Sequence, residues 1–91
     1  MPRLEKELLI TNELGLHARA SAKLVQIAAR YRSEVTVQAG DEAVDAKSIL
    51  GVLTLAAVKG TPITIITEGD DAEACLNEIA ILVNDKFGEG K

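Results

Sequence analysis

Hydrophobic residues change their spacing along the chain, and each change predicts a new element. Between residues 7 and 11 apolar positions alternate in a short run that ends at Asn12 and Gly15, which predicts a strand. Beyond Gly15 apolar residues recur at offsets of three, four and seven, so we expect a helix from about His17 to about Arg30. The residues on its buried face are Leu24, Ile27, Ala28 and Tyr31.

The middle of the chain predicts a hairpin followed by a short helix. Val35 and Val37 alternate with polar neighbours, and Gly40–Asp41 supply a turn before a second short strand around residues 43 and 44. The next segment begins at Ser48 and is apolar on all sides, so it shows no clear stripe. It ends at Lys59–Gly60, a basic residue and a glycine that commonly end a helix.

The last third of the chain predicts one more strand and one more helix. After Thr61–Pro62 the isoleucines alternate with threonine as far as the acidic turn at residues 68–71. A helix begins at Ala72, and we expect the tail from Gly88 to Lys91 to be frayed. The residues on one face of this last helix are Cys75, Ile79, Leu82 and Val83.

The order of these elements predicts an α+β fold. Strand, helix, strand, strand, helix, strand, helix (βαββαβα) is typical of an open-faced β-sandwich, in which a four-stranded antiparallel sheet carries three helices on one face. The length of 91 residues and the hydrophobic fraction of 47% fit a single domain over residues 1–91. A multi-domain enzyme is therefore excluded, and no internal repeat or linker is present.

Composition excludes several classes of function. A net charge of −4 and only two aromatic side chains argue against nucleic-acid binding, which needs positive charge or a stacking platform. With Cys75 as the single cysteine and His17 as the single histidine, we expect no disulfide, no bound metal and no cofactor. No apolar run long enough for a signal peptide or a membrane span is present, so we expect a cytoplasmic protein.

The single histidine lies at the predicted start of a helix, where chemistry is possible. The first backbone N–H groups of a helix have no partner within it and favour an anion. A histidine with an ordinary pKa of about 6.5 is partly neutral near pH 7, so its imidazole can accept a phosphoryl group. Arg19 lies close enough to donate to phosphoryl oxygens, and Gly15 permits a tight turn beside the site.

Each of these residues also has an ordinary structural interpretation. His17 could be a surface histidine or a helix cap, and Arg19 a solvated charge. Ser48 precedes an apolar run, as an N-cap does, and Leu50 and Leu53 could be core residues. Periodicity alone does not choose between the two interpretations.

Three motifs resemble those of a known family. Gly15-Leu16-His17-Ala18-Arg19, the run Ala46-Lys47-Ser48-Ile49-Leu50-Gly51-Val52-Leu53-Thr54-Leu55, and Lys59-Gly60-Thr61 are similar to the HPr family. Its members are the histidine-containing phosphocarriers of the bacterial phosphoenolpyruvate-dependent phosphotransferase system. The resemblance covers the chain from Leu4 to about Phe87, including its length and the order of its elements.

The resemblance implies a function for the histidine segment. His17 would receive a phosphoryl group on Nδ1 from phospho-enzyme I and pass it to an enzyme IIA domain, and Arg19 would match the family's active-site arginine. The protein would then be a monomeric carrier with a transient phosphohistidine, and its partners would catalyse the transfers. A regulatory or ligand-binding domain on the same fold, with His17 only a cap, is the alternative.

The resemblance also implies roles for the second helix. Ser48 would match a regulatory serine that HPr kinase/phosphorylase modifies in some bacteria. The family's apolar docking surface corresponds here to Ile49, Leu50 and Leu53. The remaining apolar residues of this segment, which we expect to face inward, are Val52, Leu55 and Ala56.

Two positions depart from the usual family pattern. Ala20 stands where proline usually follows the arginine, which removes a fixed φ but supplies a strong helix former. Leu14 stands where sugar-system members often have a small polar residue, as in some nitrogen-related members. The downstream acceptor, in a sugar or a nitrogen-related system, is therefore left open.

Overall fold

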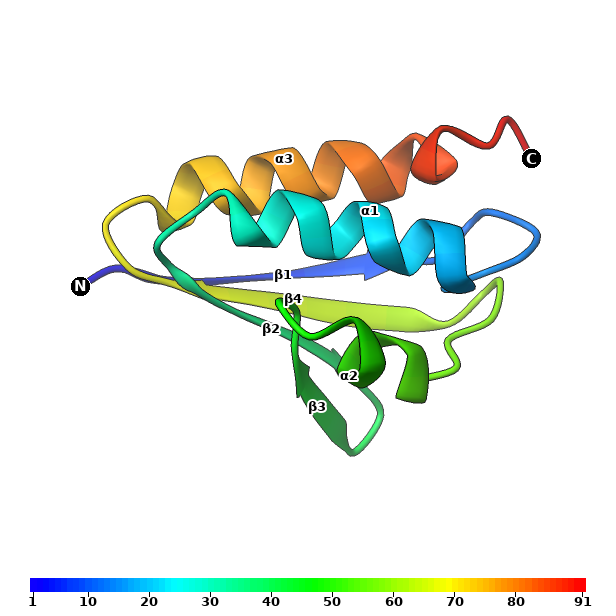
Figure 1. The fold of residues 1–91 in the computed structure, drawn as a ribbon, viewed down its shortest axis with the longest axis horizontal. Helices are drawn as coiled ribbons and strands as arrows, with labels where there is room; N and C mark the ends of the chain where they lie inside the picture. The colour runs from blue at the N-terminus through cyan, green and yellow to red at the C-terminus, as the bar shows by residue number, and fades with distance from the viewer.

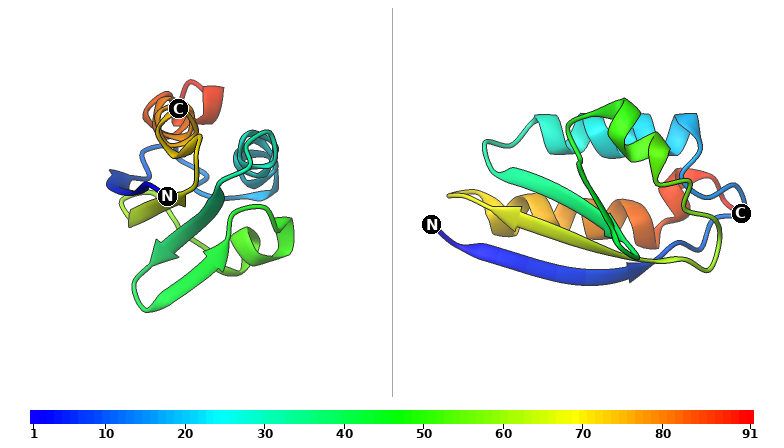
Figure 2. Two further views of the ribbon diagram at one scale, coloured as in Figure 1. Left: turned by 90° about the vertical axis from the view of Figure 1, so that its left-hand side faces the viewer. Right: turned by 90° about the horizontal axis from the view of Figure 1, so that it is seen from below.

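The fold is a twisted four-stranded antiparallel sheet with its helices on one side (Figures 1 and 2). The computed structural model describes residues 1–91. The strands, in the sheet order β1-β4-β2-β3, are β1 (Arg3–Leu9), β4 (Pro62–Glu68), β2 (Glu34–Ala39) and β3 (Glu42–Asp45). The helices are α1 (Ala18–Ala29), α2 (Ile49–Thr54) and α3 (Ala72–Asn84), and a short 3-10 turn, η1, spans Lys86–Gly88. The predicted fold class is confirmed.

The core lies between the sheet and helices α1 and α3. Alternate residues of the two central strands point into it, as Val35 and Val37 do from β2 and Ile63 and Ile65 from β4. The apolar faces predicted for α1 and α3 are also buried, apart from Tyr31 and Leu82, which are half-buried. No helix of the fold combines the length and the apolar content needed to span a membrane.

The first strand begins earlier than its pattern indicates. β1 pairs with β4 from Arg3 opposite Glu68 to Leu9 opposite Pro62, so the predicted start at residue 7 is wrong. β1 is an edge strand, and its charged residues face solvent and hide the alternation. Ile10 lies past the strand, where it is buried and bonds to the backbone of Gly60 and Thr61.

The second helix is shorter than predicted. α2 ends at Thr54, and Ala56 is exposed with a φ of 48°, so the predictions of a helix to Lys59–Gly60 and of an inward Ala56 are wrong. The chain leaves the helix because Ala57 is buried and its carbonyl accepts a hydrogen bond from Leu16 N at 2.8 Å. Local hydrophobicity cannot reveal a bond to a segment about 40 residues away in sequence.

This bond fixes the loop that carries the histidine. Gly15 has a φ of 64°, and a Cβ added there would lie 2.3 Å from Ala57 O. Only glycine combines this conformation with so close a backbone approach. Gly15 therefore holds the start of α1 against the end of the α2 segment.

Candidate functional site

His17 is the N-cap residue of α1, but its side chain does not cap the helix. Its backbone is extended, with φ −76° and ψ −178°, and its carbonyl accepts a hydrogen bond from Ser21 N at 2.9 Å. The imidazole makes no capping hydrogen bond and is 28% exposed. The ring is therefore available for chemistry at the start of a helix whose first N–H groups favour an anion.

The C-terminal tail packs beside His17, so the prediction of a frayed tail is wrong. The C-terminus lies at the same end of the molecule as the start of α1 (Figure 1). Phe87 is fully buried, its carbonyl accepts a hydrogen bond from Lys23 Nζ at 2.6 Å, and Lys91 O accepts one from Glu13 N at 3.1 Å. The tail follows the loop before α1 because a core side chain and backbone bonds hold it there.

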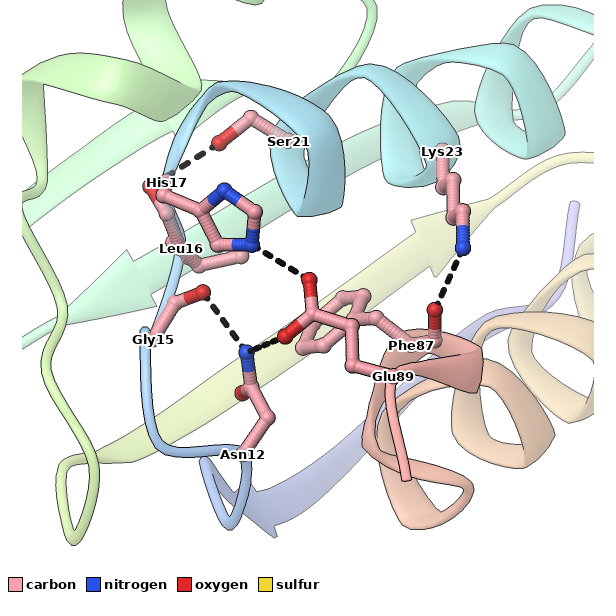
Figure 3. A network of polar contacts seen from close by, with 8 residues as sticks. All are labelled: Asn12, Gly15, Leu16, His17, Ser21, Lys23, Phe87 and Glu89. Carbon is pink, nitrogen blue, oxygen red and sulfur yellow. Dashed lines mark hydrogen bonds and ion pairs between the residues drawn. The ribbon is translucent and has the colours of Figure 1, made fainter. Parts of the chain in front are cut away.

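Glu89 brings a carboxylate to the imidazole. Its Oε2 pairs with Nε2 of His17, and its Oε1 accepts a hydrogen bond from Asn12 Nδ2 at 2.9 Å (Figure 3). The same Nδ2 donates to Gly15 O at 2.9 Å, so both of its hydrogens are used. Asn12 is fully buried, and only 11% of the Glu89 side chain is exposed.

These contacts keep Glu89 ionised. The Asn12 hydrogen bond is the largest cause, and with the His17 hydrogen bond and the charges of His17 and Lys23 it holds the pKa of Glu89 below its usual value despite burial. A carboxyl whose pKa falls on folding stabilises the folded state above the pKa of a free glutamate. That stabilisation of the docked tail is lost as the pH falls through the lowered pKa.

An open depression of about 660 Å³ surrounds this cluster. The predicted Arg19 lies on its wall, exposed and without an ion pair, beside the single histidine. Lys23 and Lys91 also line the depression, as does the acidic Glu13. Guanidinium and ammonium groups around an imidazole can neutralise a phosphoryl group attached to that ring.

The second predicted region lies on α2, which packs against α1. Ser48 is its N-cap, and its exposed Oγ accepts a hydrogen bond from Gly51 N at 3.1 Å. Leu50 is 73% exposed and Ile49 37%, whereas Leu53 is half-buried. The helix thus presents an apolar surface of these three residues, here called the α2 patch, with Ser48 at its edge.

Sequence reasoning missed Asn12, Lys23 and Glu89. A glutamate in a glycine-rich tail and an asparagine in a loop carry no periodic signal. The one available signal was Phe87, the single phenylalanine of the chain, placed in an otherwise polar terminus. No group of three or more histidine, cysteine or acidic side chains could hold a metal ion.

Comparison with known proteins identifies the family. A family model described as the PTS HPr component phosphorylation site matches residues 4–85. The chain is 44% identical over 88 residues to phosphocarrier protein HPr of Cupriavidus necator, covering 97% of this chain and 99% of that protein. It is 43% identical over 89 residues to phosphocarrier protein NPr of Shewanella violacea, covering 98% of each.

The solved structures agree with these sequence matches. The crystal structure of HPr-C-His from Thermoanaerobacter tengcongensis has a TM-score of 0.91 and 37% sequence identity, over 94% of this chain and 97% of that one. Both the family model and the curated relatives span nearly the whole fold, including the loop and helix that carry the histidine. The chain therefore belongs to the HPr family, and it is a phosphocarrier of the phosphotransferase system, not an enzyme.

Proposed function

We propose that His17 accepts a phosphoryl group on Nδ1 from phospho-enzyme I and passes it to an enzyme IIA domain. One observation carries the proposal. The single imidazole lies at the start of α1, makes no hydrogen bond that caps the helix, and borders an open depression. In the neutral ring one nitrogen carries a proton and the other a lone pair that can attack phosphorus. The carrier would act as a monomer in the cytoplasm.

The rest of the site would stabilise the phosphoryl group moderately. The first N–H groups of α1 favour an anion, and the exposed guanidinium of Arg19 can donate to two phosphoryl oxygens at once. A carrier must also release its group to the next protein. One exposed arginine in an open depression suits this better than an enclosed set of donors.

Phosphorylation by enzyme I tests the proposal directly. The protein is incubated with enzyme I and phosphoenolpyruvate, and its intact mass is measured. We expect the mass to increase by one phosphoryl group and to return after addition of an enzyme IIA domain. A protein that is never labelled would instead be a regulatory or ligand-binding member of this fold. Comparing sugar-system and nitrogen-related IIA domains identifies the acceptor, since both HPr and NPr proteins resemble this chain.

Docking of the partners is proposed to use the α2 patch. Because Leu50 is 73% exposed, replacing it with alanine should change the free energy of unfolding by less than about 0.5 kcal/mol. Truncating a central interface residue costs more than about 1 kcal/mol of binding, so affinity for enzyme I should fall by about tenfold. Titration calorimetry measures the affinity, and thermal unfolding measures the stability.

Ile81 provides the matched control for Leu50. This residue is 69% exposed, but it lies on α3 and outside the α2 patch. Ile81→Ala should leave both affinity and stability unchanged. Equal affinities for Leu50→Ala and the parent protein would contradict docking through this patch.

Ser48 is proposed as a regulatory site beside the α2 patch. A phosphate on its exposed hydroxyl would lie at the start of α2, where the helix dipole tolerates negative charge. It would also add charge next to apolar residues that must lose water when a partner docks. Ser48→Asp should therefore slow phosphorylation of His17 by about tenfold, which corresponds to about 1.4 kcal/mol. The circular dichroism spectrum should stay nearly unchanged.

Ser48→Asn separates charge from capping in this experiment. Asparagine and aspartate cap helices about as well as serine, whereas Ser48→Ala loses the bond to Gly51 and about 0.5 to 2 kcal/mol of stability. Single-turnover phosphorylation by enzyme I is compared for the aspartate and asparagine variants. Equal rates would show that charge at residue 48 does not control docking.

A further inference from the structure

The docked tail places a carboxylate where it can act on the reacting imidazole. Glu89 is two residues from the C-terminus, yet its side chain is almost as buried as a core residue. Burying a carboxylate is costly unless hydrogen bonds compensate, and here His17 and Asn12 supply them. Figure 3 shows Glu89 between these two side chains, with the second ring nitrogen of His17 facing away from it.

We propose that Glu89 is a positioning residue for phosphoryl transfer, and that Asn12 holds Glu89 in place. The carboxylate accepts a hydrogen bond from Nε2–H of His17, which fixes the ring orientation and leaves the lone pair on Nδ1. Nδ1 is the nitrogen that, under the proposed function on which this inference rests, forms the bond to phosphorus. No other acidic side chain contacts the imidazole.

The same carboxylate stabilises the charge that the reaction creates. When the lone pair of Nδ1 forms a bond to phosphorus, the bond from phosphorus to the donor enzyme breaks and its electron pair leaves with the donor. The ring keeps the proton on Nε2 and becomes a cation, which the Glu89 carboxylate faces directly. When the phosphoryl group is transferred to the acceptor, the ring leaves more readily as a cation protonated on Nε2 than it would without that proton. A paired carboxylate performs a comparable role for the histidine of serine proteases.

Asn12, Glu89 and His17 form a hydrogen-bonded network of three side chains. The Asn12 Nδ2 is held by Gly15 O and points its second hydrogen at Glu89 Oε1, so the carboxylate cannot rotate freely. The tail is held independently by Phe87 and by the Lys23 and Lys91 bonds. Loss of Asn12 should therefore loosen Glu89 without releasing the whole tail.

The first experiment needs no partner protein. Nitrogen-15 spectra of the His17 ring are recorded for the unphosphorylated full chain at a pH where the imidazole is neutral. The parent should show a protonated Nε2 whose hydrogen exchanges slowly with water, and Glu89→Ala should lose this signal. Glu89→Gln should keep only part of it, because its single amide oxygen can accept from Nε2–H or from Asn12 Nδ2, whereas the carboxylate accepts from both. Identical ring spectra for the parent and Glu89→Ala would overturn the proposal.

The second experiment measures single-turnover phosphorylation by enzyme I. Glu89→Ala should be slower than the parent by about tenfold to 100-fold, the range found when the group that orients a metal-binding histidine is removed. Glu89→Gln should fall between them, since it can keep one of the two hydrogen bonds but loses the charge. The matched control is Glu73→Gln, which removes an exposed negative charge at the opposite end of α3 and should match the parent.

A double-mutant cycle tests whether Asn12 acts through Glu89. Asn12→Ala alone should slow phosphorylation less than Glu89→Ala, and adding it to Glu89→Ala should cause no further loss. Additive effects would show that Asn12 acts apart from Glu89. Faster transfer by Glu89→Ala would overturn the positioning role, because it would show that the docked tail hinders phosphorylation of His17. If the parent itself is not phosphorylated, the proposed function fails. If the parent and Glu89→Ala are phosphorylated at equal rates, only the role of Glu89 is refuted.

Discussion

Replacing His17 with alanine is expected to abolish phosphoenolpyruvate-dependent labelling completely. The chain has no other imidazole, and the hydroxyl of Ser21 in the first turn of α1 is buried and bonded to Leu16 O. Loss of the acceptor removes the reaction itself, so no residual rate should remain. Intact mass and acid-labile phosphate, measured after incubation with enzyme I, check this result.

The variant should remain folded, which makes the loss interpretable. His17 is partly exposed and its backbone, not its side chain, takes part in the first turn of α1. Its ring does pair with Glu89, and a hydrogen bond to a charged group contributes at most about 3 kcal/mol. Thermal unfolding should still show a single cooperative transition, at a lower temperature than in the parent. Acid-labile phosphate on the folded His17→Ala protein would exclude His17 as the acceptor.

The local spacing of hydrophobic residues was enough to predict the elements that bury one face in the core. The offsets of Leu24, Ile27 and Ala28 predicted α1, and the alternation of Val35 and Val37 predicted β2, because one face of each element is buried. The boundaries failed where another segment decides the conformation. Ala57 ends the α2 segment by bonding to Leu16, and the edge position of β1 removes the alternation that would mark its start.

The residues of the candidate site also fall into two groups, those marked by local sequence and those that only the tertiary fold brings to the site. His17, Arg19 and Ser48 lie at helix starts, and adjacent motif residues mark them in the sequence. Glu89 reaches the site from 72 residues away, through a contact that depends on the complete tertiary fold. Neither composition nor periodicity contains that pairing, so the structure is the first place where it is visible.

Phe87 is expected to be the most costly residue of the tail to truncate. It is fully buried and has the largest volume among the fully buried side chains. Replacing a buried phenylalanine with alanine removes about 3 to 5 kcal/mol of stability, from lost transfer energy and the cavity left behind. In a domain of about this size each kcal/mol lowers the melting temperature by about 4 to 8 °C. Differential scanning calorimetry of Phe87→Ala measures the loss, and Ile81→Ala, a truncation at an exposed position of α3, should change stability by less than about 0.5 kcal/mol.

Phe87 also connects the stability of the tail to the chemistry of the histidine. The side chain anchors the tail two residues before Glu89, so its loss should free the carboxylate from His17 and Asn12. Phe87→Leu keeps an apolar anchor and should fold even if the alanine variant does not. We expect it to lose part of the slow-exchanging Nε2 signal and to be phosphorylated at a rate between those of the parent and Glu89→Ala. A large loss of stability together with a parental ring spectrum and rate would show that Glu89 holds its position without the Phe87 side chain, through Asn12 and the Lys23 and Lys91 bonds to the tail backbone.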